Sequence, residues 1–181
     1  HLSRQVDAPA VLVAGNHEFY GGIMERCIDD LRAQSDDEVR FLESESVMIG
    51  GVRILGTTLW TDFALNPDKK LGVLQELHKV MNDYRWIKRL STTRGTRKID
   101  THWVLALHFK QRSWLTSELA KEFDGPTIVV THHAPSRRSL ARRDANRIVA
   151  AAYASDLEAL VNDHRIAAWA HGHIHDSVDY M

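Results

Sequence analysis

The chain has 181 residues, of which 44% are hydrophobic and 26% are charged; this is ordinary globular usage and excludes collagen-like and disordered classes. Such a length fits one domain and allows about 70% of the unfolded surface to be buried. Lysine and arginine number 23 against 24 acidic residues, so no whole-chain field attracts nucleic acid or an anionic membrane. A single cysteine and the lack of a long apolar run predict a cytoplasmic protein without a membrane span.

Apolar patterns in the first third of the chain predict several strands and one helix. The apolar run at residues 10–14 lies between Pro9 and Gly15, which is typical of a strand buried on both faces. Apolar residues then recur at helical spacing over 22–34, which predicts a helix. Further strands are expected at 39–42, 46–49 and 52–56.

Two long helices are predicted in the middle of the chain, at 69–87 and 101–123, where apolar stripes recur at helical spacing. Between them, residues 91–98 are rich in Ser, Thr, Gly and basic side chains, which indicates an exposed loop. The remaining elements are expected to be strands at 127–130 and 167–170 and a helix at 156–164. This order predicts one mixed α/β domain over residues 1–181.

The histidines are clustered. Of eleven, six lie in three short segments that each follow a predicted buried strand. The carboxyl ends of parallel strands meet at one edge of an α/β sheet, and ligands bind in the crevice there. We therefore expect the three segments to share one pocket. The segments are Gly-Asn-His-Glu at 15–18, Thr-His-His-Ala-Pro at 131–135 and His-Gly-His-Ile-His-Asp at 171–176.

The third segment has a spacing that suits a metal ion. In extended backbone, residues two apart share a face, so His173 and His175 lie about 6.6 Å apart along the chain. Both imidazoles can then reach one ion, or two ions about 3.5–4 Å apart. The amide oxygen of Asn16 is a harder ligand than imidazole. Nitrogen and oxygen donors without thiolate are typical of hydrolytic sites.

Each segment also has a purely structural explanation. Gly15 and Asn16 could form only a turn, and His132 and His133 could be one buried and one exposed histidine. The run at 171–175 is harder to explain in this way. We place His133 and His171 outside the ligand set, as core residues or supports of the ligands.

The segments Gly-Asn-His-Glu at 15–18, Thr-His-His-Ala-Pro at 131–135 and Gly-His-Ile-His at 172–175 resemble the last three motifs of the calcineurin-like metallophosphoesterases, in that family's order. The likeness covers nearly the whole chain, since Leu-Trp-Thr-Asp-Phe at 59–63 and Met-Asn-Asp-Tyr-Arg at 81–85 are similar to a bacterial branch of it. The resemblance implies a four-layer αββα sandwich of two mixed β-sheets flanked by helices.

The resemblance also implies a metal-dependent phosphoesterase that hydrolyses phosphomonoesters or phosphodiesters. Asn16, His132 and His173 would bind one ion of a dinuclear divalent-metal centre, and His175 would bind the other. His17 would face the phosphate and assist while a metal-activated hydroxide attacks phosphorus. The partner is then a phosphate-ester substrate. No pattern distinguishes Mn, Fe, Zn or Ni, names the natural substrate or fixes an oligomeric state.

The sequence departs from the family before Gly15. There the family carries an Asp-x-His and a Gly-Asp-x-x-Asp motif, which supply the remaining ligands and the bridging carboxylate, whereas Asp7 is the only acid upstream of Gly15 here. Without carboxylates, nothing offsets the charge of two divalent ions. We therefore expect an internal fragment, incomplete at both ends, that holds at most one weakly bound ion.

Two other functions stay open. Loss of the carboxylate ligands could leave an inactive, metal-free binding or interaction module. A metallo-β-lactamase-type hydrolase carries a His-x-His-x-Asp-His pattern similar to residues 171–176, but the last two residues are interchanged here.

Weaker candidates for substrate contacts are polar, aromatic and basic residues outside the three segments. For these, core packing, surface ion pairing or a solvated basic loop is the default explanation. They are Trp60, Asp62, Asn82, Arg85, Arg137, Arg138, Arg142 and Arg143.

Overall fold

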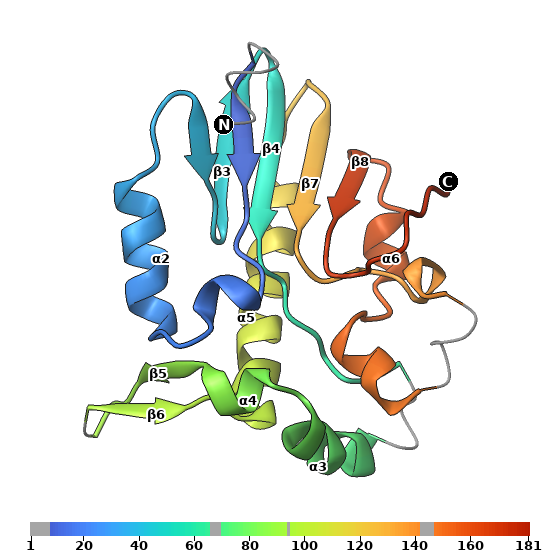
Figure 1. Cartoon of the computed structure of the whole chain (residues 1–181). Coiled ribbons are helices and arrows are strands. Elements are labelled where there is room, and N and C mark those ends of the chain that lie inside the picture. Colours follow the sequence, from blue (N-terminus) through green and yellow to red (C-terminus); the bar gives the residue numbers. More distant parts are fainter. Residues whose placement is uncertain (1–7, 66–69, 94, 142–146) are drawn as a thin grey trace.

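A computed structural model describes residues 8–65, 70–93, 95–141 and 147–181. The predicted fold class, a mixed α/β sandwich with more than one sheet, is confirmed (Figure 1). The strands are β1 (Ala10–Leu12), β2 (Val39–Phe41), β3 (Glu45–Ile49), β4 (Val52–Thr57), β5 (Lys88–Leu90), β6 (Thr96–Lys98), β7 (Thr127–Thr131) and β8 (Ile166–His171). The helices are α2 (Met24–Ala33), α3 (Lys70–Val80), α4 (Asp83–Trp86), α5 (Thr101–Leu119) and α6 (Glu158–Val161), with 3-10 turns η1 (His17–Phe19), η3 (Arg137–Ser139) and η4 (Ile148–Ala152).

A four-stranded sheet in the order β3-β4-β7-β8 forms the centre of the fold. Its first two strands are antiparallel and are joined at Gly50 and Gly51, whose φ values of 56° and 81° suit a two-residue hairpin turn. The strands β4, β7 and β8 are parallel, and their arrows point toward the lower half of the molecule in Figure 1. The segments that follow them therefore leave the sheet at one edge.

The strands β1 and β2 form a separate parallel pair that packs on one face of this sheet (Figure 1). The two layers meet at Gly56 of β4, where an added Cβ would lie 2.5 Å from Leu42 Cβ and 3.1 Å from Val13 Cγ1. Beyond this point, Thr58 Oγ1 donates a hydrogen bond to the Ala14 carbonyl at 2.9 Å. These contacts bring the segment after β1 to the same edge as the segments after the parallel strands.

The longest helix, α5, covers the opposite face of the sheet (Figure 1). Its Leu115 and Leu119 are fully buried and pack with Leu55 and Val129 of the sheet. Leu55 and Gly56 are neighbours in β4, so their side-chain directions point to opposite faces. The order of layers is therefore helix, main sheet and second sheet.

A larger core lies beyond the carboxyl edge of the sheet, where η1, α3, α4 and η4 meet. This core gives the loops that follow the strands a packed base. Its fully buried members include Phe19, Phe63, Leu77, Ile87 and Ile99.

Two strands are less buried than the sequence predicts. Leu12 of β1 is 39% exposed, and Ala167, Ala168 and Ala170 of β8 are also exposed. Each strand has one neighbour in the described part of the chain, β2 for β1 and β7 for β8. The prediction of a strand buried on both faces is therefore wrong for β1, and the prediction of a buried strand is wrong for β8.

The predicted helices differ in extent from the observed ones. The single helix predicted over 69–87 is wrong, because α3 ends at Val80 and α4 begins at Asp83. Asn and Asp side chains compete with the helix backbone for hydrogen bonds, and the Asp83 carboxylate bonds outside its own helix. The helices α5 and α6 also end earlier than predicted, at Leu119 and Val161. None of the described helices combines the length and hydropathy needed to cross a bilayer.

The segment predicted as an exposed loop at 91–98 contains part of a hairpin. The strands β5 and β6 pair antiparallel, with Leu90 opposite Thr96. Residues 96–98 are exposed as predicted. Composition indicated exposure correctly but gave no sign of strand pairing, because a two-stranded pair on the surface needs no alternation of polar and apolar residues.

We expect Gly56→Ala to lower the free energy of unfolding by about 1–3 kcal/mol, because the added methyl group overpacks the contact between the sheets. The matched control is Gly72→Ala in α3, where an added Cβ meets open space and helix propensity favours alanine by up to about 1 kcal/mol. Urea unfolding followed by circular dichroism measures both. Equal effects of the two substitutions would show that the sheets do not meet tightly at Gly56.

Candidate metal centre

Donor atoms from three loops converge beyond the carboxyl edge of the sheets. His132 Nε2 lies 3.1 Å from Asn16 Oδ1 and 3.0 Å from His173 Nδ1. Asn16 follows β1, His132 follows β7 and His173 follows β8. The structure thus brings together three side chains that are more than 40 residues apart in the chain, at the edge where the strand order places them.

Gly15 makes room for the His132 ring. A Cβ at Gly15 would lie 2.3 Å from His132 Cε1, 2.6 Å from Nδ1 and 2.8 Å from Nε2. Any side chain there would displace the imidazole. The glycine before Asn16 is therefore a packing requirement of the site as well as part of a turn.

His173 has a backbone conformation that is rare for a residue with a side chain. Its φ is 61°, in the left-handed region, and Ile174 N donates to the Gly172 carbonyl at 2.7 Å. This bond closes a three-residue turn. The extended geometry predicted for His173 and His175 is therefore wrong, because the strand ends at His171 and the chain turns at His173.

The turn at His173 has a cost in stability. Besides the unfavourable φ, its Nε2 is buried without a hydrogen-bond partner in the described part of the chain. Strained backbone and unsatisfied buried nitrogen both oppose folding, and such features persist mainly at functional sites. The conformation of His173 is therefore better explained by a functional constraint than by stability.

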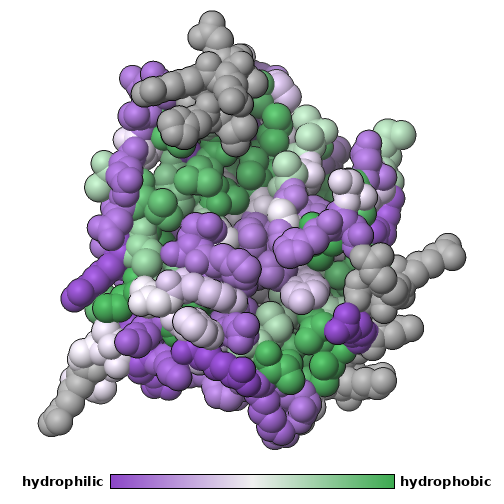
Figure 2. All heavy atoms as spheres, viewed as in Figure 1, coloured by the Kyte–Doolittle hydropathy of each residue, from purple (hydrophilic) through white to green (hydrophobic). Residues whose placement is uncertain are grey.

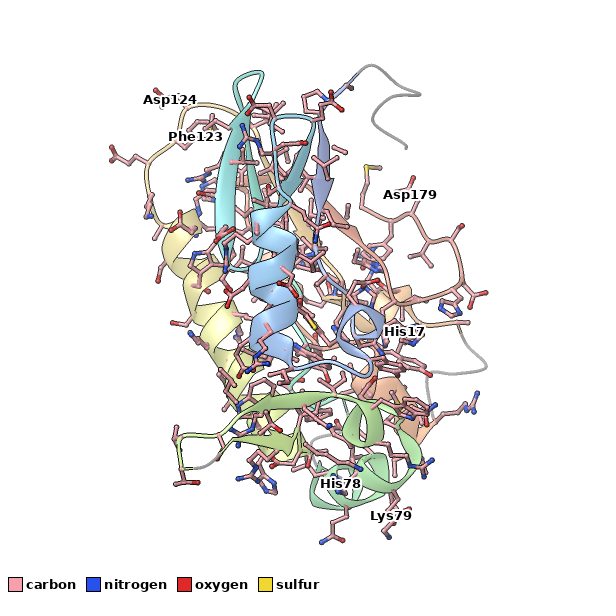
Figure 3. All side chains as sticks on the ribbon, turned by 60° about the vertical axis from the view of Figure 1, so that its left-hand side comes forward. His17, His78, Lys79, Phe123, Asp124 and Asp179 are labelled. Carbon is pink, nitrogen blue, oxygen red and sulfur yellow. The ribbon has the colours of Figure 1, made fainter. Side chains whose placement is uncertain are left out.

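A cavity of about 700 Å³ is lined by residues of all three loops, among them His17, His175 and the three donors. Figure 2 shows hydrophilic side chains gathered across the middle of one face, below a hydrophobic area near the upper strands. His17 is exposed on η1, with its ring 4.6 Å from the Tyr20 ring, and Figure 3 shows it well away from His78 of α3. His175 is also exposed.

The two remaining histidines of the segments lie outside the donor cluster. His133 is 1% exposed, and its ring contacts the rings of Trp60 at 5.0 Å and His173 at 4.5 Å. His171 Nε2 lies 2.9 Å from Ser139 Oγ. His133 therefore packs against His173 from within the core, and His171 contacts Ser139 of η3.

Burial keeps the two imidazoles of the donor cluster neutral. It lowers the pKa of His132 to about 4 and the pKa of His173 to about 3, and the neighbouring His132 lowers the latter further. A neutral imidazole presents a lone pair, which is the form that binds a metal ion.

The donor cluster fits a divalent ion. Two ligands bound at right angles with bonds of about 2.1 Å lie about 3.0 Å apart, close to the separations of 3.0 and 3.1 Å observed here. His132 Nε2 carries at most one hydrogen, so it cannot donate to Asn16 Oδ1 and also accept from His173 Nδ1. In the described residues no three His, Cys, Asp or Glu side chains are grouped to hold a metal ion. The cluster is instead two imidazoles and one amide.

Sequence reasoning missed Asp83, which contacts the donor cluster. This carboxylate is 4% exposed and accepts hydrogen bonds from Asn16 Nδ2 at 2.8 Å and Tyr20 Oη at 2.7 Å. It lies 67 residues from Asn16, so no local spacing links the two. The only available signal was its place in the Met-Asn-Asp-Tyr-Arg segment, of which only Asn82 and Arg85 were predicted as candidates.

The weaker polar candidates have different surroundings. Trp60 and Asp62 are buried, at 3% and 8% exposed, and the Asp62 carboxylate bonds within its own loop. Asn82 lines the cavity. Arg85 is exposed and donates to the Lys79 carbonyl at 2.6 Å. Of the four, only Asn82 borders the space near the donors.

Of the four arginine candidates at 137–143, Arg142 and Arg143 lie outside the described residues. Arg137 donates to the Leu65 carbonyl. The Arg138 guanidinium packs over an aromatic ring of the C-terminal segment, 4.2 Å from its centre. Both described arginines therefore have structural partners.

We expect Gly15→Ala to weaken Mn²⁺ binding at least tenfold, because the added methyl group displaces the His132 ring. The control is Gly172→Ala, whose Cβ would lie 3.4 Å from His132 Nδ1, an ordinary contact. Titration calorimetry measures both affinities. Binding by the Gly15→Ala variant within twofold of the unaltered chain would contradict the role given to this glycine.

A model of the calcineurin-like phosphoesterase family matches residues 1–177. No curated protein and no solved structure shows a significant match to the chain. The matched range includes all three loops of the donor cluster, and the resemblance found in the motifs is confirmed. The chain therefore belongs to the calcineurin-like phosphoesterase family.

Proposed function

We propose that this chain is a metal-dependent phosphoesterase in which Asn16, His132 and His173 hold one divalent ion. The observation that carries the proposal is the meeting of their donor atoms, at 3.0 and 3.1 Å from His132 Nε2. Family membership supports a phosphoesterase activity in general. The substrate class is a phosphomonoester or phosphodiester.

A bound divalent ion supplies positive charge that polarises a phosphoryl oxygen and lowers the pKa of a water molecule. The three donors are uncharged, so they add no negative charge that would repel an anionic phosphate. The amide of Asn16 and the two partly buried imidazoles are also held by packing before any ligand enters, which favours a preorganised site.

His17 is the residue that we assign to the phosphate rather than to the ion. It is exposed on η1 and borders the same cavity as the donors. An imidazole can hold a proton near neutral pH and give it to a leaving oxygen. Its contact with the Tyr20 ring restricts the directions it can take.

We propose one ion, because the three donor atoms that meet in the described residues gather around one point, His132 Nε2. His175 borders the same cavity but is exposed. The described residues contain no group of three His, Cys, Asp or Glu side chains around which a second ion could be held. His175 is therefore expected to contribute less to metal affinity than His132.

Chelator-treated protein titrated with Mn²⁺ should bind one ion per chain, and His132→Ala should reduce the affinity at least tenfold because it removes the central donor. His164→Ala is the control, since that histidine is exposed and lies outside the cavity. Calorimetry gives both affinity and stoichiometry. Absence of binding would favour a metal-free interaction module, and tight binding of two ions would contradict a single site.

His17→Ala should lower Mn²⁺-dependent hydrolysis of an aryl phosphate by about 10²-fold or more, because it removes a proton donor at the phosphate. The metal affinity should stay within about twofold, since His17 is not among the three donors. Parallel assays of hydrolysis and Mn²⁺ binding separate the two effects. Full activity in the variant would remove His17 from the proposal.

A further inference from the structure

Asp83 lies behind Asn16, on the side away from His132. Its Oδ1 accepts both the Asn16 amide at 2.8 Å and the Tyr20 hydroxyl at 2.7 Å. We propose that Asp83 is a positioning residue that fixes which atom Asn16 presents to the ion and strengthens that atom as a ligand. This inference rests on the proposed function, because it concerns the same site.

The hydrogen-bond pattern determines the orientation of the Asn16 amide. An ionised carboxylate only accepts hydrogen bonds, so the amide nitrogen must face Asp83. The amide oxygen then faces His132, as observed at 3.1 Å. If the amide rotated by half a turn, its NH₂ group would face the donors and could not bind a cation. Asp83 therefore selects the orientation of Asn16 that is competent for binding.

The surroundings of Asp83 leave a negative charge to be balanced. Its two partners are a neutral amide and a phenol, and no described cationic side chain pairs with it. Burial and the adjacent carboxylate raise the pKa of Tyr20, so the phenol stays a donor. A buried charge is unfavourable without compensation, and an ion on the far side of Asn16 would provide it.

Hydrogen bonding to Asp83 also acts on the amide itself. A carboxylate that accepts from the amide nitrogen polarises the group and increases the negative charge on its oxygen. Partners of this kind behind a metal ligand typically change affinity by about 10–100-fold. The Asn16 amide oxygen therefore becomes more negative, while the side chain as a whole stays neutral.

Backbone contacts hold Asp83 in place. The break between α3 and α4 puts Asp83 at the start of a new helix. Gly21 N donates to the Trp86 carbonyl at 2.9 Å, and Lys88 N donates to the Gly22 carbonyl at 3.0 Å. The loop that carries Asn16 and the segment that carries Asp83 are therefore tied together at the C-terminal end of α4.

An exchange of the two residues tests the proposal. Asp83→Asn should weaken Mn²⁺ binding about tenfold, because the amide at position 16 loses its charged acceptor. In the Asn16→Asp background, Asp83→Asn should instead raise the Mn²⁺ affinity. There it replaces two facing carboxylates by one carboxylate, at position 16, that accepts a hydrogen bond from the amide nitrogen at position 83. Calorimetry on the four proteins measures the coupling. If Asp83 had a purely structural role, Asp83→Asn would change the Mn²⁺ affinity in the same direction in both backgrounds.

Tyr20→Phe is a second, milder test that leaves the ring contacts in place. It removes one donor to Asp83 and should weaken Mn²⁺ binding by about two- to fivefold. Glu76→Gln, in an exposed ion pair with Lys79, is the control and should leave affinity unchanged. Thermal unfolding confirms that each variant is folded.

The possible failures are distinguishable. If the unaltered chain binds no Mn²⁺, the proposed function is wrong and this inference falls with it. If the unaltered chain binds Mn²⁺ and Asp83→Asn has the same effect with Asn or Asp at position 16, the positioning role alone is overturned.

Discussion

The close approach of His132 Nε2 to Asn16 Oδ1 and His173 Nδ1 is the interaction on which the site depends. Three electron-pair donors cannot be packed around one point without a hydrogen or a cation between them. Two neighbouring parallel strands deliver the histidines, and the second sheet delivers the amide. The arrangement of the strands therefore determines the short distances between the three donor atoms.

Packing, rather than hydrogen bonding alone, maintains this approach. The loop after β4 contains three non-glycine residues with positive φ, Leu59 at 68°, Trp60 at 41° and Phe63 at 55°. Such conformations are unfavourable and need support from their surroundings. His108 of α5 provides it, with Nδ1 2.8 Å from the Leu59 carbonyl. The loop in turn places Trp60 against His133, which contacts His173.

The fold class and the meeting of the three loops could be predicted from the sequence, because strand order determines which loops share an edge. The turn at His173 could not, since its φ of 61° depends on packing against the neighbouring loops. The contact of Asp83 with Asn16 could not be predicted either, because it spans 67 residues and arises from the break between two helices. Local patterns identify strands and helices, but they do not determine which buried polar groups meet.

The neutral character of the three donors bears on the proposed function. With an ion bound, a carboxylate one hydrogen bond behind Asn16 would place negative charge near the ion while the direct ligands stay uncharged. The face toward a substrate would then stay favourable for an anion. The same hydrogen bond makes the segment containing α4 part of the proposed site, although this segment lines the cavity only at its start.

The most direct test is a crystal structure of the protein grown with Mn²⁺, in which anomalous scattering locates the ion. One strong peak is expected within bonding distance of Asn16 Oδ1, His132 Nε2 and His173 Nδ1. A peak bonded to other residues, or no peak at a Mn²⁺ concentration well above that of the protein, would contradict the proposed site.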